Sequence, residues 1–309
     1  MMYALKVIRI IHLLPFFLIF QIGCDSLVIP LSTAKPAESL NGISLEKVNI
    51  CASQGEFQSY DIGAELSSTE EGIKTMLVFG THAGDFNTIE YMQKLRSSLP
   101  ELQAKGIKRF LIVVNGKTGQ CKMLAKLLDL PEEIELFADP TGEAGRKFGV
   151  SRGFRPDDES MPPFVKQFFS GIGIGPPWMT LPAVLPGYFG DPNGQRGWIE
   201  TSLKQGQEAG RWPAVLEFDG KGNVIGNKFD NAPLVSDWGQ RPFELATLRL
   251  QNLIGIQIKH WSELRPVDDR CLTQYGGCTI VGPSGESLYS WVDRGLCDVP
   301  NMFDILETI

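Results

Sequence analysis

The sequence predicts an α/β protein with a central mixed β-sheet flanked by helices. Two observations support this class. Apolar strands alternate with amphipathic helices between residues 73 and 150, and an antiparallel hairpin followed by a short helix closes the chain. Strands separated by helices favour a parallel sheet with right-handed crossovers, to which a hairpin adds antiparallel strands. With 309 residues, 43% of them apolar, the chain is long enough to bury such a core.

The expected elements follow one another in a regular order, beginning with one or two edge strands within residues 42–63. Strands are then expected at 72–80, 107–116 and 134–140, and helices at 86–105, 118–130 and 142–150. The first of these helices is amphipathic, with one face formed by Ile89, Met92, Leu95, Leu99 and Leu102.

The alternation stops at residue 150. Proline and glycine crowd residues 151–200 too densely for long regular elements. A hairpin around Gly220–Gly222 and a helix over 242–264 follow, and then a second hairpin around Ser284–Gly285 and a closing helix. A β-α-β-α-β-α series, one antiparallel hairpin and a last helix are the element order of the thioredoxin-like fold, so one of the two hairpins is surplus to it.

The N-terminus has the character of a leader. Lys6 and Arg9 precede an apolar stretch that is shorter than the ~20 residues needed to cross a bilayer, so we expect residues 1–26 to be a cleaved signal peptide. An uncleaved anchor is the alternative. The hydroxylated, lysine-bearing segment 27–45 resembles the second part of a two-part plastid leader, with Leu27 after the cleavage point. Export to a plastid (chloroplast) is therefore expected, with secretion or a lipoprotein linked at Cys24 as alternatives.

Composition excludes several classes of partner and site. The net charge is −7 and no run of Lys and Arg stands out, which argues against nucleic acid. The chain has three His and six Cys, without a CxxC or a Cys/His cluster at metal-ligand spacing. We expect no metal, no other cofactor and no transmembrane span once the leader is removed.

The stretch "LVFGTHAGDFNTIEYM", residues 77–92, has the outline of a redox site without its sulfur atoms. A strand runs through a short loop into a helix, whose first N–H groups would stabilise a thiolate held there. The chain instead has Asp85, Phe86, Asn87 and Thr88.

Three segments resemble the peroxiredoxin-like branch of the AhpC/TSA group (peroxiredoxin-like 2 type). The loop "THAGDFNT" is similar to R-H-x-G-C-x-x-C. The segments "QYGGCTIVGPSGESLYSWVDRG" and "PNMFDILETI" are similar to Q-x-G-G, strand, G-P-G-G, strand, and D-x-x-D-I-L. The resemblance implies a thioredoxin-like fold and antioxidant thiol-redox chemistry, and it selects the C-terminal hairpin for the core.

This choice of hairpin defines the expected domain. Residues 46–150 and 263–309 would form the thioredoxin-like domain, and residues 151–262 would be a large insertion before the C-terminal hairpin. Thr75–Gly80 and Phe110–Asn115 should then be parallel neighbours in the sheet, with Cys278–Val281 antiparallel beside them.

Carrying the family's chemistry over residue by residue gives a degenerate site. Thr81 matches the family's active-site threonine, but the nucleophile falls on Gly84 or Asp85, and neither can attack a peroxide. We expect Asp85 to cap the helix by accepting from the N–H of Asn87 or Thr88, rather than to be catalytic. His82 is expected to pack in the loop, with a proton donor at a relict site as the alternative.

Cys121 lies in the first turn of the second helix, beside Lys117 and Lys122, where its pKa could be lowered. A small buried packing residue is the alternative.

Cys271 and Cys297 are a second candidate for thiol chemistry. A two-residue turn at Ser284–Gly285 would pair Thr279 with Ser290 and Val281 with Leu288, and the same register continued outward brings Cys271 near Cys297. A disulfide and two separate thiols both remain open.

Two functions follow. One is an atypical thiol oxidoreductase or peroxidase of the antioxidant class, and the other is a non-catalytic binding or assembly protein of a plastid membrane complex. The insertion carries many large rings: Phe164, Phe168, Phe169, Trp178, Tyr188, Phe189 and Trp198. We expect most to be core and a minority, drawn from Phe164, Phe168, Phe169 and Trp178, to contact a protein partner.

Overall fold

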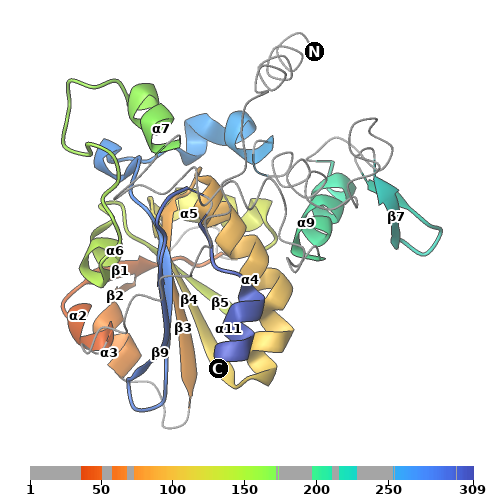
Figure 1. Ribbon diagram of the computed structural model, residues 1–309, viewed down its shortest axis with the longest axis horizontal. Helices are drawn as coiled ribbons and strands as arrows, with labels where there is room; N and C mark the ends of the chain where they lie inside the picture. The colour runs from red at the N-terminus through yellow and green to blue at the C-terminus, as the bar shows by residue number, and fades with distance from the viewer. Residues whose placement is uncertain are drawn as a thin grey trace, which may run out of the picture.

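A seven-stranded mixed sheet organises the chain (Figure 1). The computed structural model describes residues 36–50, 58–67, 73–171, 173, 197–210, 216–227, 253, 255–296 and 298–309. The strands of the sheet are β1 Ser44–Lys47, β2 Ser59–Asp61, β3 Lys74–His82, β4 Ile107–Asn115, β5 Ile134–Ala138, β8 Gly277–Val281 and β9 Ser287–Val292. Their order across the sheet is β2-β1-β5-β4-β3-β8-β9.

The pairing of the strands confirms the predicted thioredoxin-like arrangement. β3, β4 and β5 are parallel, and β8 runs antiparallel beside β3, so that Val78 lies between Ile112 and Cys278. β1, β2 and β9 extend the two sides with antiparallel pairs. Among the described residues, the hairpin around Gly220–Gly222 forms a separate two-stranded sheet, in which β6 (Leu216–Phe218) pairs with β7 (Val224–Asn227).

Helices cover both faces of the sheet. They are α2 Pro36–Ser39, α3 Ile62–Ser67, α4 Phe86–Ala104, α5 Thr118–Leu127, α6 Glu143–Phe148, α7 Pro163–Gly171, α9 Gly197–Glu208 and α11 Met302–Thr308. α4, α5 and α11 pack on one face, and α2, α3 and α6 pack on the other. All five apolar residues expected on the inner face of α4 are buried.

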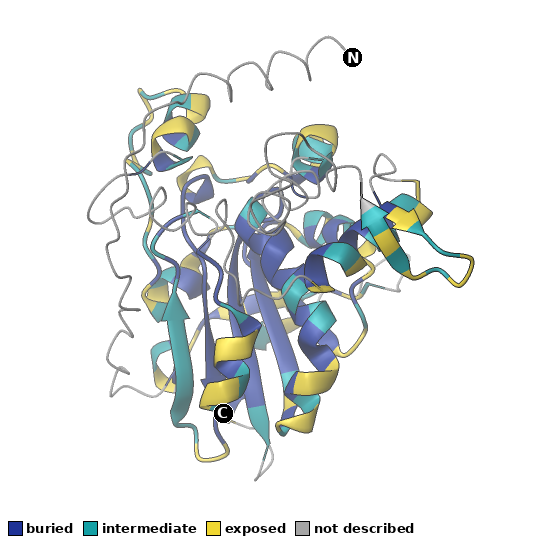
Figure 2. Cartoon of the chain, turned by 45° about the vertical axis from the view of Figure 1, so that its right-hand side comes forward, coloured by how far each residue is buried: buried dark blue, intermediate teal, exposed yellow. Residues whose placement is uncertain are grey.

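The central strand β3 is buried on both sides, as Figure 2 shows for the middle of the sheet. Met76 and Val78 face α4, while Leu77 and Phe79 face the opposite helical layer, because successive side chains of a strand alternate between faces. β3 continues to His82, two residues beyond its predicted end. His82 pairs with Asn115 across an irregularity in the ladder.

The folded domain also starts earlier than the expected boundary at residue 46. Leu40, Ile43 and Leu45 are buried in the layer formed with α2 and α3. Residues 36–45 therefore belong to the domain. Residues 1–35, including the expected signal peptide, lie outside the described residues.

Two helices in the insertion were not predicted. α7 begins at Pro163, where a missing N–H costs nothing because the first turn of a helix has no acceptor for it. α9 packs against α4 and brings Trp198 and Leu203 into the core. The helix expected over 242–264, by contrast, is seen over 255–264 within the described residues. The proline and glycine content of residues 151–200 therefore concealed α7 and α9, each of which begins or ends at a proline or a glycine.

The C-terminal hairpin follows the predicted register only in part. Thr279 lies opposite Ser290 as expected, but Val281 lies opposite Ser287 rather than Leu288, after an irregularity beside Ile280. The ladder ends at Gly277 and does not continue to Cys271, which closes a 3-10 turn. Cys297 lies outside the described residues.

Within the described ranges, every helix is too short or too polar to cross a bilayer.

Candidate functional site

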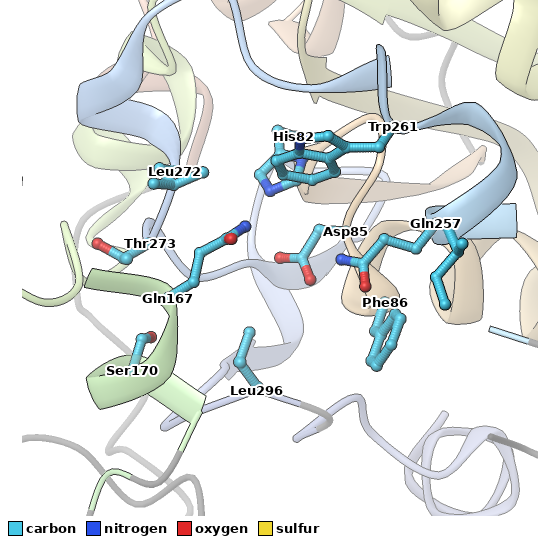
Figure 3. A pocket seen from close by; sticks show the side chains of 11 residues that line it. His82, Asp85, Phe86, Gln167, Ser170, Gln257, Trp261, Leu272, Thr273 and Leu296 are labelled. Carbon is cyan, nitrogen blue, oxygen red and sulfur yellow. The ribbon is translucent and has the colours of Figure 1, made fainter. Parts of the chain in front are cut away.

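The loop after β3 joins the sheet to the N-terminus of α4. The N–H of Asp85 donates to the carbonyl oxygen of His82 (3.0 Å), and the carbonyl oxygen of Asp85 accepts from Ile89 (3.1 Å). Asp85 thus has the backbone conformation of an N-cap, with φ −92° and ψ 148°. Its side chain, however, makes no cap hydrogen bond, so the expected bond from Asn87 or Thr88 is absent. The carboxylate instead faces a pocket (Figure 3).

This pocket has a volume of about 330 Å³ and lies at the carboxyl end of β3. Its walls come from the loop, from α7, from the 255–264 segment and from two positions near the C-terminal hairpin (Figure 3). It is lined by His82, Asp85, Phe86, Gln167, Ser170, Gln257, Ile258, Trp261, Leu272, Thr273 and Leu296. Residues from the 151–262 region are thus five of the eleven that line the pocket beside the loop after β3.

His82 packs between the loop and the insertion. Its ring meets Trp261 edge to face, with centroids 5.6 Å apart, and is 1% exposed. The Nδ1 atom is buried without a hydrogen-bond partner among the described residues. Burial lowers the pKa of His82, while the charge of Asp85 opposes the shift, so the imidazole is neutral at pH 7.

Thr81 and Thr88 face the core below the pocket. Their hydroxyl oxygens are 2.9 Å apart, and both side chains are fully buried. A Cβ at Gly80 would lie 2.9 Å from the Thr88 hydroxyl, so this glycine allows the pair to approach the strand. Thr88, which aligns with the second cysteine of the family motif, thus forms a hydrogen bond with Thr81, which aligns with the family's threonine.

A buried polar cluster links the first turns of α4 to the end of β9. Asn87 Nδ2 and Tyr91 Oη donate to the two carboxyl oxygens of Asp293 at 2.8 and 2.7 Å. Burial raises the pKa of Asp293 and of Tyr91. A Cβ at Gly276 would lie 2.6 Å from the Phe79 carbonyl oxygen, so this glycine is needed for close packing. This cluster was not predicted, and its one signal in the sequence is an acid directly after an apolar strand.

Comparison with known proteins identifies the family. A protein-family model described as AhpC/TSA antioxidant enzyme matches residues 94–295, more than half of the chain. The chain belongs to the AhpC/TSA antioxidant enzyme family. No curated protein and no solved structure matches it. The match begins inside α4, after the loop at 81–88, and it extends through residues 151–262 to the end of the C-terminal hairpin.

The end of the 255–264 segment packs against the loop after β3. A Cβ at Gly84 would lie 3.2 Å from the carbonyl oxygen of Leu264, at the end of the 255–264 segment. Gln120 Nε2, at the start of α5, donates to the carbonyl oxygens of Glu263 (3.0 Å) and Arg265 (2.7 Å). These contacts hold residues 263–265 against Gly84 in the loop after β3.

The described cysteines are buried thiols. Cys121 is fully buried, and burial raises its pKa to about 12, with the charges of Asp139 and Glu46 adding to the shift. Cys121 is thus the buried packing residue of the two alternatives, because desolvation outweighs any lowering of its pKa by the helix N-terminus.

The other described thiols are also poor nucleophiles. Cys271 donates to the carbonyl oxygen of Thr141 (3.2 Å), and burial raises its pKa to about 12. Burial likewise raises the pKa of Cys278 in β8. Cys24, Cys51 and Cys297 lie outside the described residues, so the Cys271–Cys297 pairing stays a prediction.

Three aromatic residues of the 151–262 region are exposed. Phe164, Phe168 and Phe169 on α7 are 72%, 61% and 44% exposed, while Trp198 is buried against α4. All three belong to the set from which the exposed minority was expected. Trp178, Tyr188 and Phe189 lie outside the described residues, so the expectation that most of the seven rings are core stays a prediction.

Proposed function

We propose that this AhpC/TSA family member belongs to the antioxidant thiol-redox class by descent and has lost peroxide reduction at the loop after β3. The observation that carries the proposal is the carboxylate of Asp85 at the N-terminus of α4. Peroxide reduction needs a sulfur atom that accepts an oxygen and becomes a sulfenic acid. A carboxylate cannot do this, and Thr88 holds the position of the second cysteine.

Thiol chemistry elsewhere in the chain would need other cysteines. The thiolate is the reactive form, and the raised pKa values of Cys121 and Cys271 keep both thiols protonated at neutral pH. Cys121, or Cys271 exchanging with Cys297, are the remaining routes to an atypical thiol oxidoreductase.

Peroxide consumption tests the proposal. The intact protein, Cys121→Ala and the Cys271→Ser/Cys297→Ser double variant are assayed with a thiol reductant, after circular dichroism has established that each is folded. We expect no consumption by any of them. Consumption lost only in Cys121→Ala would make Cys121 the nucleophile, and loss only in the double variant would assign the pair. Robust consumption that persists in both variants would overturn the proposal.

A second candidate is a non-catalytic binding or assembly protein of a plastid membrane complex. The exposed rings of Phe164 and Phe168 on α7 favour it, since contiguous exposed apolar residues mark interaction surfaces. Phe169 stacks on Phe154 with ring centroids 5.3 Å apart, which fixes the orientation of α7. Native gel electrophoresis of organelle membranes should show co-migration of the protein with a large complex. The Phe164→Ser/Phe168→Ser variant should migrate alone, and equal migration would exclude α7 as the contact.

The plastid location is part of this proposal and rests on the composition of residues 1–45. A fluorescent protein fused behind residues 1–45 should enter the plastid, and the same fluorescent protein without these residues should not. Secretion of the first fusion would replace the plastid with the extracellular space.

A further inference from the structure

The pocket beside the relict loop contains one charged side chain, the carboxylate of Asp85. Asp85 is 6% exposed, and within the described part of the chain no Lys, Arg or His side chain forms an ion pair with it. The carboxylate faces the pocket and makes no cap hydrogen bond. The first N–H groups of α4 stabilise its negative charge. A bound cation would supply the ion-pair partner that the described residues do not, through a charge-assisted hydrogen bond.

The other walls of the pocket suit an organic cation. Phe86 and Trp261 supply aromatic surface, which attracts ammonium groups through the electrons of the ring face. Gln167 from α7 and Gln257 from the 255–264 segment point toward Asp85 from opposite sides (Figure 3). Their amide oxygens can accept additional N–H donors.

His82 adds a second unsatisfied group at the same place. It is neutral, 1% exposed, and its Nδ1 has no partner among the described residues. A neutral imidazole tolerates a nearby cation that a protonated one would repel. An anionic ligand is disfavoured, because the carboxylate of Asp85 already occupies the electropositive end of α4.

We propose that this pocket binds a small organic cation, an amine protonated at neutral pH that carries an apolar body, with Asp85 as its anionic partner. The volume of about 330 Å³ is at the lower end of the range of small-molecule sites and accommodates one aromatic ring with an ammonium group. The apolar body would contact Phe86 and Trp261, and the ammonium group would lie between the carboxylate and the two glutamine amides. This inference rests on the proposed loss of peroxide reduction, because its anionic partner, Asp85, is the residue that aligns with the family's cysteine.

Binding is tested with four probes that share a benzyl or phenyl group. Benzylammonium and benzyltrimethylammonium are cations, benzyl alcohol is neutral and benzoate is an anion. Titrations follow the indole N–H resonance of Trp261 in the full chain, which has six tryptophans, and the resonance is assigned by its disappearance in Trp261→Phe. We expect saturable shifts with at least one of the two cations and none with benzoate. Absence of saturable binding by both cations, or equal affinity for benzyl alcohol, would overturn the proposal.

Matched variants locate the anionic partner. Asp85→Asn keeps the shape and is itself a good N-cap residue, and it should weaken cation binding about tenfold or more through loss of one charge-assisted contact. Glu101→Gln removes an exposed carboxylate from the other end of α4 and should leave the affinity unchanged. Unchanged affinity in Asp85→Asn, or an equal loss in Glu101→Gln, would contradict the assignment.

A second variant keeps the test valid if Asp85→Asn proves unstable. Trp261→Leu removes the aromatic wall and also the resonance used as readout, so its binding is measured by isothermal titration calorimetry beside the wild type. It should weaken both cations while leaving the weak binding of benzyl alcohol unchanged. Equal weakening of all three ligands would indicate a simple apolar cavity and overturn the proposal. The outcome is separable from the peroxidase test, because peroxide consumption is measured without these amines. Failure to bind amines would leave the loss of peroxide reduction unaffected.

Discussion

The thiol of Cys121 should stay protonated at neutral pH and should destabilise the folded chain in alkali. Burial raises its pKa from 9.0 to about 12, so the thiolate fraction near neutral pH falls about a thousandfold. Between pH 9 and 12 the unfolded chain loses a proton that the folded chain retains. The free energy of unfolding should therefore fall by about 1.4 kcal/mol for each pH unit through this one group.

Two measurements check these magnitudes. Alkylation of Cys121 by iodoacetamide at about pH 7.5, quantified by mass spectrometry, should be at least a thousandfold slower in the folded chain than in urea. Urea unfolding of the wild type and of Cys121→Ala between pH 8.5 and 10.5 should give a steeper loss of stability in the wild type, by about 1.4 kcal/mol per pH unit. Alkylation near the unfolded rate, or parallel pH slopes, would refute the reasoning.

Three further predictions concern packing, protonation and processing. Gly276→Ala should destabilise the fold by about 1–3 kcal/mol, because its Cβ would lie 2.6 Å from the Phe79 carbonyl oxygen. Gly119→Ala, where nothing lies within 4 Å, should be neutral or stabilising by up to about 1 kcal/mol in thermal unfolding. Burial lowers the pKa of His82, so below pH 6.5 the unfolded chain binds a proton that the folded chain does not. The free energy of unfolding should therefore decrease as the pH is lowered below 6.5, and the decrease should be smaller in His82→Gln. The same pH dependence in the wild type and in His82→Gln would contradict this prediction. The mature chain should begin at Leu27 or later by intact mass, and Met1 on it would restore the membrane anchor.

The sheet could be predicted because its evidence is local. Thr75–Gly80 and Phe110–Asn115 are apolar runs of strand length separated by one amphipathic helix, and such runs bury on both sides only in a parallel sheet. The place of Cys278–Val281 required more, since periodicity cannot distinguish between two hairpins. The likeness of the C-terminal segment to the AhpC/TSA group provided that choice, and the strand order confirms it.

The candidate site could not be predicted, since it depends on residues distant in sequence. Asp85 sits where a cap residue is favoured, but its side chain faces a pocket whose far wall includes Gln167 and Trp261 from the insertion. The protonation state of Cys121 also depends on tertiary packing. Its position in a first helical turn indicates a lowered pKa, yet complete burial dominates, and burial is a property of the tertiary fold.

Amino-acid composition likewise could not predict which aromatic side chains are exposed. Large aromatic residues are on average highly buried, and Trp198 is buried against α4. Phe164 and Phe168 are not, because the orientation of α7 is set by contacts that no count of residues contains.

Trapping of sulfenic acid tests the central claim most directly. The intact protein is exposed to hydrogen peroxide together with a 1,3-dicarbonyl reagent that captures sulfenic acids, and every cysteine peptide is quantified by mass spectrometry. The loss of the peroxidatic site predicts no rapid trapping at Cys121, Cys271 or Cys278, because their thiols are buried and protonated. Rapid and stoichiometric trapping at any of these three would contradict the account.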